Sequence, residues 1–258
     1  MVNASFEIDD GGGYVTIERE EALNALDTPT KAAITERLRD WRDEDAVRAV
    51  VLRSEGDRAF CAGGDIKEIP EVDYSLSYFT ETWGELFEAM RDLGKPTIAA
   101  VRGYALGGGF DLVCHTDIPI AADDAMLGQP ESGLGIVNHF APPVLLRTVG
   151  QKKALDLLLT GEPISGAEAA ELGLVSRSVP AEELDAEVES VVASIAEKSP
   201  RVMRKLKAGI HDAMELSPAE GREHLEEIAL AAARTDPDYR EGVEAQLEDR
   251  EPEWASED

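Results

Sequence analysis

Two glycine-rich segments decide the fold of this sequence: FCAGGDIK at residues 60–67 and GYALGGGFDL at residues 103–112. Each lies downstream of a short apolar run, at residues 47–52 and 97–101, of the kind that forms a strand covered on both faces. A glycine loop between a strand and a helix lets backbone N–H groups approach a ligand, and the helix adds the positive end of its dipole. Either segment alone could equally be a tight turn, and neither fits a dinucleotide fingerprint or a Walker loop.

The rest of the chain sets these loops in a mixed architecture. An N-terminal hairpin is predicted around the DGGG turn at residues 10–13, and a third buried strand at 118–122 follows the second loop. From residue 139 onward the pattern is almost wholly helical, and the last helices are predicted at 181–197, 200–215, 218–234 and 237–249. Strands that alternate with helices and then give way to a run of helices predict an α/β core with a helical C-terminal region.

Taken together, the two glycine segments closely resemble the two signature segments of the crotonase (enoyl-CoA hydratase/isomerase) family. GQPESGLG at residues 128–135 resembles the third signature of that family, and GQKKAL at 150–155 and SGAEA at 165–169 continue in the same order. The resemblance implies a crotonase-like spiral of ββα repeats with the acyl-CoA site over residues 1–195, and a helical trimerisation region over residues 196–258. It also implies self-association as a trimer or as a dimer of trimers.

The resemblance further implies roles for individual residues. The backbone N–H groups of Ala62 and Gly108 would form an oxyanion hole for the thioester oxygen of an acyl-CoA substrate, and Asp111 and Glu131 would be the catalytic carboxylates. No metal or redox cofactor is expected, because coenzyme A is part of the substrate. The residues expected to contact the substrate are Ala22, Leu23, Ala62, Gly63, Gly64, Asp65, Lys67 and Gly108.

The chemistry of these roles agrees with the spacing of the residues. Reaction at the Cα atom of a thioester passes through an enolate, and two fixed N–H donors stabilise its oxygen by roughly 3–4 kcal/mol each. Asp111 lies one helical turn after Gly108 and therefore faces the same pocket. Addition of water across a Cα=Cβ bond needs one carboxylate to take a proton from water and another acid to protonate Cα. We therefore predict an enoyl-CoA hydratase, which converts a 2-enoyl-CoA to a 3-hydroxyacyl-CoA.

Two departures from the family pattern leave alternatives open. Asp111 stands where hydratases usually carry glutamate, so double-bond isomerisation, acyl-CoA hydrolysis and decarboxylation remain candidates, with a non-catalytic binding protein as the alternative class. The segment IVNHFAPP at residues 136–143 replaces the usual loop and would roof the acyl pocket, so the preferred acyl chain is not predicted. Asp111 could instead serve only the helix dipole, and Glu131 could be a solvated acid. His115 and His139 stay outside the catalytic set, with a reservation for His139.

The net charge excludes more classes of function than any other feature of the composition. The sequence has 53 acidic and 25 basic residues, which give a formal net charge of −28. Such a chain repels polyanions, so nucleic-acid binding is not expected. An acidic surface suits molar salt, where the Debye length falls to ~3 Å, and we predict a halophilic protein. No membrane contact is expected, because no apolar run approaches the roughly 18–20 residues that span a bilayer. A cytoplasmic location is expected, because the sequence shows no signal-peptide pattern and its two cysteines make no disulfide framework.

The net charge leads to a prediction about salt. CoA is itself anionic, so long-range repulsion should weaken its binding in dilute buffer, and screening by salt should relieve that repulsion. We expect the apparent Michaelis constant for an enoyl-CoA to fall, and the melting temperature to rise, between low and molar KCl. The cations best placed to hold the phosphates are Lys67 and Arg19, and Lys67→Ala should weaken binding at every salt concentration. Steady-state kinetics over a KCl series check this, and a Michaelis constant that climbs with salt contradicts the halophilic interpretation.

Overall fold

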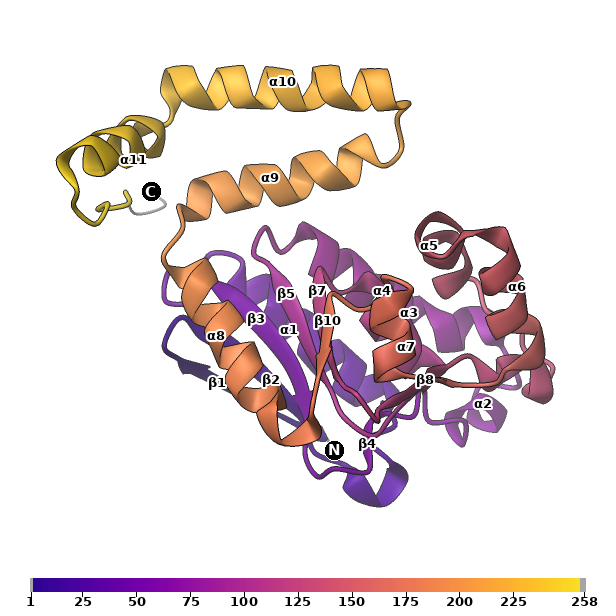
Figure 1. Cartoon of the computed structure of the whole chain (residues 1–258). Coiled ribbons are helices and arrows are strands. Elements are labelled where there is room, and N and C mark those ends of the chain that lie inside the picture. Colours follow the sequence, from indigo (N-terminus) through magenta and orange to yellow (C-terminus); the bar gives the residue numbers. More distant parts are fainter. Residues whose placement is uncertain (1, 256–258) are drawn as a thin grey trace.

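The computed structural model describes residues 2–255, apart from the side chains of Tyr78 and Phe79, and contains two β-sheets surrounded by helices (Figure 1). The larger sheet has the strand order β1-β2-β3-β5-β7-β10, with bounds Ala4–Asp9, Gly12–Ile17, Ala49–Ser54, Thr97–Val101, Ile118–Ala122 and Arg177–Val179. The smaller sheet has the order β4-β6-β8-β9, with bounds Ala59–Cys61, Tyr104–Leu106, Met126–Gly128 and Ile164–Ser165. The hairpin β1–β2 and the pair β8–β9 are antiparallel, and the other neighbours run parallel.

Three successive segments of the chain share one plan. β3 and β4 lead into α2 (Glu68–Glu71) and α3 (Leu76–Asp92), whereas β5 and β6 lead into α4 (Gly108–His115). β7 and β8 lead into the 3-10 helix Pro130–Leu134 and then α5 (Ala141–Thr148). Each segment gives its first strand to the larger sheet and its second strand to the smaller one, so the chain advances by one strand in both sheets with every repeat. This arrangement confirms the predicted spiral of ββα repeats.

The central strands of the larger sheet are largely apolar, and helices cover both of their faces. Successive side chains of a strand point to opposite sides. In β3, Val50 and Leu52 belong to the main core, which includes side chains of α1 (Thr28–Trp41) and α3. Ala49 and Val51 face the other way and pack with α8 (Leu184–Ala196). The expectation of a strand covered on both sides is therefore confirmed for β3.

The C-terminal helices lie close to their predicted positions, with α9 at Pro200–Ala213, α10 at Pro218–Thr235 and α11 at Pro237–Glu248. Each begins with a proline, and the serine or aspartate before it accepts a hydrogen bond from a first-turn N–H. Figure 1 shows α9 and α10 as an antiparallel pair to one side of the sheets. The division of the chain between residues 195 and 196 stays a prediction. Within residues 2–255, no helix is both long and apolar enough to cross a membrane.

A buried ion pair joins α9 to the body of the protein. The Lys207 ammonium lies 2.8 Å from an Asp117 carboxylate oxygen and donates to the carbonyl oxygens of Met90 and Lys95 at 2.7 and 3.0 Å. The Thr97 N–H and hydroxyl donate to the same carboxylate at 2.8 and 2.7 Å. Because a buried charge without its partner is strongly destabilising, this pair holds the middle of α9 against the body of the protein.

Two glycine substitutions test how closely the repeats pack. Gly166 begins α7 (Gly166–Glu171), and a Cβ atom there would lie 2.0 Å from the carbonyl oxygen of Ala122 in β7. We expect Gly166→Ala to lower the free energy of unfolding by about 1–3 kcal/mol, because a backbone atom cannot move aside cheaply. The matched control is Gly84→Ala in α3, where a Cβ meets nothing within 4 Å. That change should stabilise by about 0.5–1 kcal/mol, and denaturant unfolding curves of both variants measure the difference. Equal effects would show that this contact between α7 and β7 is not tight.

Candidate active site

The two glycine loops meet because the strands before them are neighbours. β4 and β6 run parallel in the smaller sheet, so the loops that leave their carboxyl ends lie side by side. A Cβ atom added to Gly63 would lie 3.1 Å from the backbone nitrogen of Gly108. A Cβ atom added to Gly109 would lie only 1.9 Å from the carbonyl oxygen of Cys61. The glycines therefore allow the first turn of α4 to pack directly on the first loop, backbone against backbone.

The backbone N–H groups of Gly64 and Gly108, one in each loop, have no hydrogen-bond partner among the described residues. The Leu26 N–H donates to the Gly63 carbonyl at 2.8 Å, and the Asp65 N–H donates to the Leu26 carbonyl at 3.0 Å. In such a parallel bridge the residue between, Gly64, points its own N–H to the opposite side. Gly108 is the first residue of α4, where a helical N–H has no intrahelical acceptor and the dipole is positive.

The prediction that Ala62 supplies the first donor is wrong. The Ala62 N–H donates to the Leu23 carbonyl at 3.0 Å and thereby holds the first loop against the segment before α1. Gly64, two residues further on, has the N–H that remains available. The sequence could not separate these two candidates, because only the strand-like partner of the loop decides which of its N–H groups point outward.

Trp83 of α3 fixes the second donor in place. A Cβ atom on Gly108 would lie 2.5 Å from Cζ2 of the Trp83 indole, so the ring packs on the glycine Cα. Trp83 is buried, and the ammonium of the equally buried Lys31 lies over the ring, 5.1 Å from its centroid. Burial lowers the pKa of Lys31 to about 8. Only glycine fits at position 108 as long as the indole occupies this place.

Asp111 lies in the first turn of α4 and is only 3% exposed. The Gln129 amide donates to its Oδ1 at 2.7 Å, and the Asn138 amide donates to its Oδ2 at 2.8 Å. Burial raises the pKa of Asp111 to about 7; the nearby Glu131 charge adds to the rise, and the two amides oppose it. Asp111 can therefore gain or lose a proton near neutral pH.

Glu131 reaches the same place from the 3-10 helix Pro130–Leu134. Its Oε1 lies so close to Gly107 that a Cβ there would approach it to 2.9 Å. Its Oε2 is buried and has no hydrogen-bond partner in the described part of the chain. Burial raises the pKa of Glu131. A buried carboxylate oxygen without a partner costs stability, and such exceptions need an explanation, which a reacting proton or a ligand provides.

These groups surround a cavity of about 100 Å³. The predicted residues that line it are Ala62, Gly63, Gly64, Gly108, Asp111 and Glu131. The others that line it are Ile66, Leu76, Thr80, Trp83, Gly107, Pro130, Leu134, Ile136, Val137, Asn138, His139 and Phe140. Ile66, Leu134 and Val137 are also exposed to solvent, so the cavity opens on their side. The reservation for His139 therefore has a structural basis, since its ring lies at the cavity wall.

Asp65 does not line the cavity but holds the first loop from behind. Its carboxylate accepts a hydrogen bond from the Arg19 guanidinium at 2.7 Å and another from the Lys67 N–H at 3.1 Å. Burial alone would raise the pKa of Asp65, yet these two bonds outweigh it and lower the pKa. Arg19 also donates to the Ala25 carbonyl at 3.1 Å, and Asp27 lies 3.9 Å away. Arg19 thus already pairs with carboxylates, and its contact with phosphates stays a prediction.

The remaining predicted residues lie beside the cavity. Ala22 ends the 3-10 helix Glu20–Ala22, and Leu23 follows it with a left-handed φ of +52° and accepts the bond from Ala62. Lys67 is exposed, and its ammonium has no hydrogen-bond or ion-pair partner among the described residues. Lys67 is therefore the cation next to the first loop that stays available for an anionic group.

Sequence reasoning missed Gln129 and Asn138, the two side chains that hold the Asp111 carboxylate. Gln129 is buried in the segment between β8 and Glu131, whereas Asn138 belongs to the unusual loop before α5. One sign of their role is present in the sequence: both are amides, and they lie in the segments 128–135 and 136–143 that are expected to form the pocket. Nothing in the sequence shows that they converge on one carboxylate, because they lie 18 and 27 residues from it along the chain.

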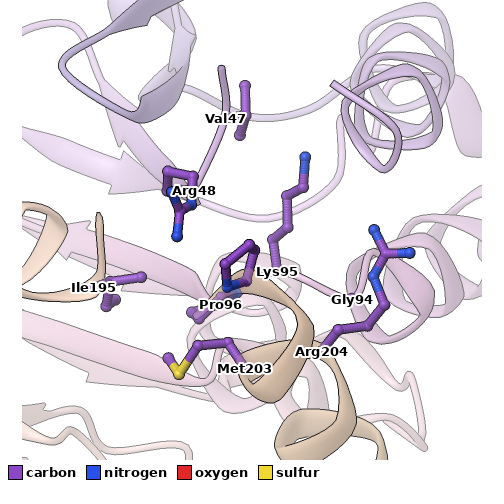
Figure 2. A pocket seen from close by; sticks show the side chains of 9 residues that line it. Val47, Arg48, Gly94, Lys95, Pro96, Ile195, Met203 and Arg204 are labelled. Atoms are coloured by element: carbon purple, nitrogen blue, oxygen red, sulfur yellow. The ribbon is translucent and has the colours of Figure 1, made fainter. Parts of the chain in front are cut away.

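A second hollow, shown in Figure 2, lies where α9 meets the segment before β5. Arg48, Lys95 and Arg204 line it, but each donates to main-chain carbonyl oxygens, and the volume of about 10 Å³ has room for one water molecule. This hollow is too small for a substrate. Within residues 2–255, no group of three or more His, Cys, Asp or Glu side chains is placed to hold a metal ion.

Comparison with known proteins agrees with this geometry. The chain matches the model of the family described as enoyl-CoA hydratase/isomerase over residues 7–257. It is 38% identical over 252 residues to a Mycobacterium tuberculosis protein described as a probable enoyl-CoA hydratase, with 96% of each chain covered. It is 38% identical over 257 residues to a Bacillus subtilis protein of the same description, with 98% of each chain covered.

Solved structures give the same result. The crystal structure of enoyl-CoA hydratase from Bacillus anthracis superposes with a TM-score of 0.93 at 30% sequence identity, covering 99% of this chain and 100% of that one. The likeness therefore extends over the whole chain in both sequence and fold. The protein belongs to the enoyl-CoA hydratase/isomerase family, which is also called the crotonase family.

Proposed function

We propose that this protein is an enoyl-CoA hydratase that adds water to a 2-enoyl-CoA and forms a 3-hydroxyacyl-CoA. One observation carries the proposal: the unpaired backbone N–H groups of Gly64 and Gly108, the buried Asp111 carboxylate and the half-buried Glu131 carboxylate line a single cavity. The N–H groups of Gly64 and Gly108 can both donate to one thioester oxygen, because the loops that carry them lie in contact. Asp111 and Glu131 then lie where the reacting carbons of the acyl group would extend from that oxygen.

The two N–H groups would stabilise the charge that develops as water attacks. When the water oxygen bonds to Cβ, the electrons of the double bond move towards the carbonyl, and the thioester oxygen becomes an enolate oxygen. Each fixed donor lowers the barrier by roughly 3–4 kcal/mol in an enclosed site. Gly108 adds the positive end of the α4 dipole. No backbone rearrangement is needed, since close packing of the loops already fixes both donors.

The two carboxylates would handle the protons. One takes a proton from the water that attacks Cβ, and the other delivers a proton to Cα, so water is added and the pair again holds one proton. Burial and mutual repulsion raise the pKa of Asp111 to about 7, and burial raises that of Glu131. Asp111 therefore still holds a proton at pH values just below neutrality, and the pair then has the acid that protonation of Cα needs.

The second candidate function is isomerisation of an enoyl-CoA double bond. It is favoured by the contrast between the two carboxylates: both oxygens of Asp111 already accept amide hydrogen bonds, whereas Glu131 Oε2 accepts none in the described part of the chain. A single base that removes a proton from one carbon and returns it to another would suffice for isomerisation. In that case Asp111 would organise Gln129 and Asn138 rather than act on water.

The remaining parts of the proposal concern binding and assembly. Lys67, exposed beside the first loop, would pair with a phosphate of CoA. We also propose self-association as a trimer or a dimer of trimers through the C-terminal helices. In its support, Tyr239, Val243 and Leu247 follow one another every four residues on α11 and are 55%, 48% and 80% exposed. Such a stripe on a helix beside the body is typical of a face that a partner covers.

Substitution of the two carboxylates separates hydration from one-base chemistry. We expect Glu131→Gln to lower kcat by at least about a hundredfold without weakening substrate binding, because the amide keeps the shape and loses the transferable proton. For hydration, Asp111→Asn should cost about as much, since both groups act on one water. The measurement is the loss of enoyl-CoA absorbance in the ultraviolet, with Glu171→Gln on the exposed side of α7 as the control. Near-normal turnover in Glu131→Gln would remove that residue from the mechanism, and damage in Glu131→Gln alone would favour isomerisation.

The pH dependence of kcat/KM gives a second test. Below about pH 7 Asp111 holds its proton, and above that pH it loses the proton that it would deliver to Cα. We therefore expect kcat/KM for hydration to fall as the pH rises through about 7. The alkaline fall should be absent from the residual activity of Asp111→Asn. A wild-type profile that stays level between about pH 6 and pH 9 would contradict the shared-proton mechanism.

A further inference from the structure

A second and much larger cavity adjoins the candidate active site. It measures about 690 Å³ and lies between α9 and the body, with apolar side chains such as Val144, Leu206 and Ile210 in its walls. The two cavities share two lining residues, His139 and Phe140. These two side chains therefore stand between the small space that holds the carboxylates and the large apolar space behind it.

Phe140 is the centre of an aromatic wall between the two spaces. Its ring centroid lies 4.9 Å from that of Phe87 in an edge-to-face contact, 4.1 Å from that of His139 and 6.4 Å from that of His115. Phe87 in turn stacks on Trp83 at 5.7 Å and on His115 at 4.2 Å. Trp83 lines the small cavity, whereas Phe87 and His115 line the large one. The rings therefore form one continuous layer from one cavity to the other.

The wall is held at a fixed position relative to the catalytic acid. The side-chain oxygen of Asn138 accepts hydrogen bonds from the N–H groups of Phe140 at 3.0 Å and Ala141 at 3.1 Å. The amide nitrogen of the same side chain donates to Asp111 at 2.8 Å. Asn138 thus connects the backbone of Phe140 to the Asp111 carboxylate. The Phe140 ring contacts the rings of Phe87 and His139, which restrict its movement.

We propose that Phe140 closes the acyl end of the active-site cavity and restricts the enzyme to short-chain 2-enoyl groups. The cavity of about 100 Å³ must take the thioester next to Gly64 and Gly108 and the reacting carbons next to the carboxylates, so little of it remains for an alkyl tail. A longer tail would have to pass the Phe140 ring to reach the apolar space behind it. This inference rests on the proposed function, since it names the acyl chain that the same site accepts.

Enlarging the opening at Phe140 tests the proposal. We expect wild-type protein to prefer crotonyl-CoA to octenoyl-CoA, and Phe140→Ala to raise the ratio of kcat/KM for octenoyl-CoA over crotonyl-CoA by at least about tenfold. Binding of the unreactive butyryl-CoA and octanoyl-CoA, followed by titration calorimetry, should show the same shift without any reaction. The full chain is used in the assembly that it forms, and melting curves identify misfolded variants. If Phe140→Ala fails to fold, Phe140→Leu should give a smaller shift in the same direction.

Two control variants locate the path of the longer chain. Val144 lies one helical turn after Phe140 and lines the large cavity, so Phe140→Ala combined with Val144→Phe places a new ring behind the gap. This double variant should lose the octenoyl-CoA activity that Phe140→Ala gained and keep activity on crotonyl-CoA. Met214, on the α9 side of the large cavity, is the matched truncation, and Met214→Ala alone should leave the chain-length preference unchanged.

The outcomes distinguish this proposal from the function on which it rests. If wild-type protein hydrates octenoyl-CoA as well as crotonyl-CoA, the wall does not limit chain length and the proposal is overturned while hydration stands. The same holds if folded Phe140→Ala and Phe140→Leu show no shift in kinetics or in octanoyl-CoA binding. Absence of turnover on every enoyl-CoA contradicts the proposed function instead, and the binding series with saturated acyl-CoAs then still reports on the wall.

Discussion

The contact between the two glycine loops, backbone against backbone, is the constraint on which the rest of the site depends. At Gly109 the first turn of α4 approaches the Cys61 carbonyl so closely that even a methyl group has no room. This approach brings the free N–H groups of Gly64 and Gly108 to one cavity and sets the start of the helix that carries Asp111. Side chains could not achieve the same spacing, because each would add several ångströms between the loops. The parallel pairing of β4 and β6 supplies the scaffold that maintains this contact.

Electrostatics at the site follow from burial rather than from the charge of the whole protein. The chain carries a formal net charge of −28, yet the cavity holds only two carboxylates, and burial raises the pKa of both. Asp111 is kept from an ordinary low pKa although two amides donate to it, because desolvation outweighs them. At Asp65, behind the first glycine loop, burial is outweighed by the hydrogen bonds from Arg19 and the Lys67 N–H, and the pKa is lowered. The Arg19–Asp65 ion pair also holds this loop in place. Two neighbouring aspartates thus differ in behaviour because one faces a cation and the other does not.

The loop before α5 connects the Asp111 carboxylate to the aromatic side chains between the two cavities. Asn138 joins the Asp111 carboxylate to the backbone at Phe140, and Phe140 joins a layer of rings that runs from Trp83 to His115. The Asp111 carboxylate and the layer of rings are therefore linked through one amide side chain. Burial lowers the pKa of His115, which disfavours its charged form, and the ring stacks on Phe87. Its exclusion from the catalytic set stays a prediction.

The sequence by itself determined the fold class, the order of elements and the segments that meet at the site. Apolar runs, glycine loops and N-terminal prolines are local signals, so β3, β5, α4 and the C-terminal helices could be located within a few residues. Tertiary structure alone decided that Gly64 rather than Ala62 has the free N–H, that Arg19 is paired with Asp65, and that Gln129 and Asn138 hold Asp111. Each of these depends on the direction of a group relative to a partner far away along the chain. Periodicity and motifs specify which residues occur together, whereas hydrogen-bond direction and burial exist only once the chain has packed.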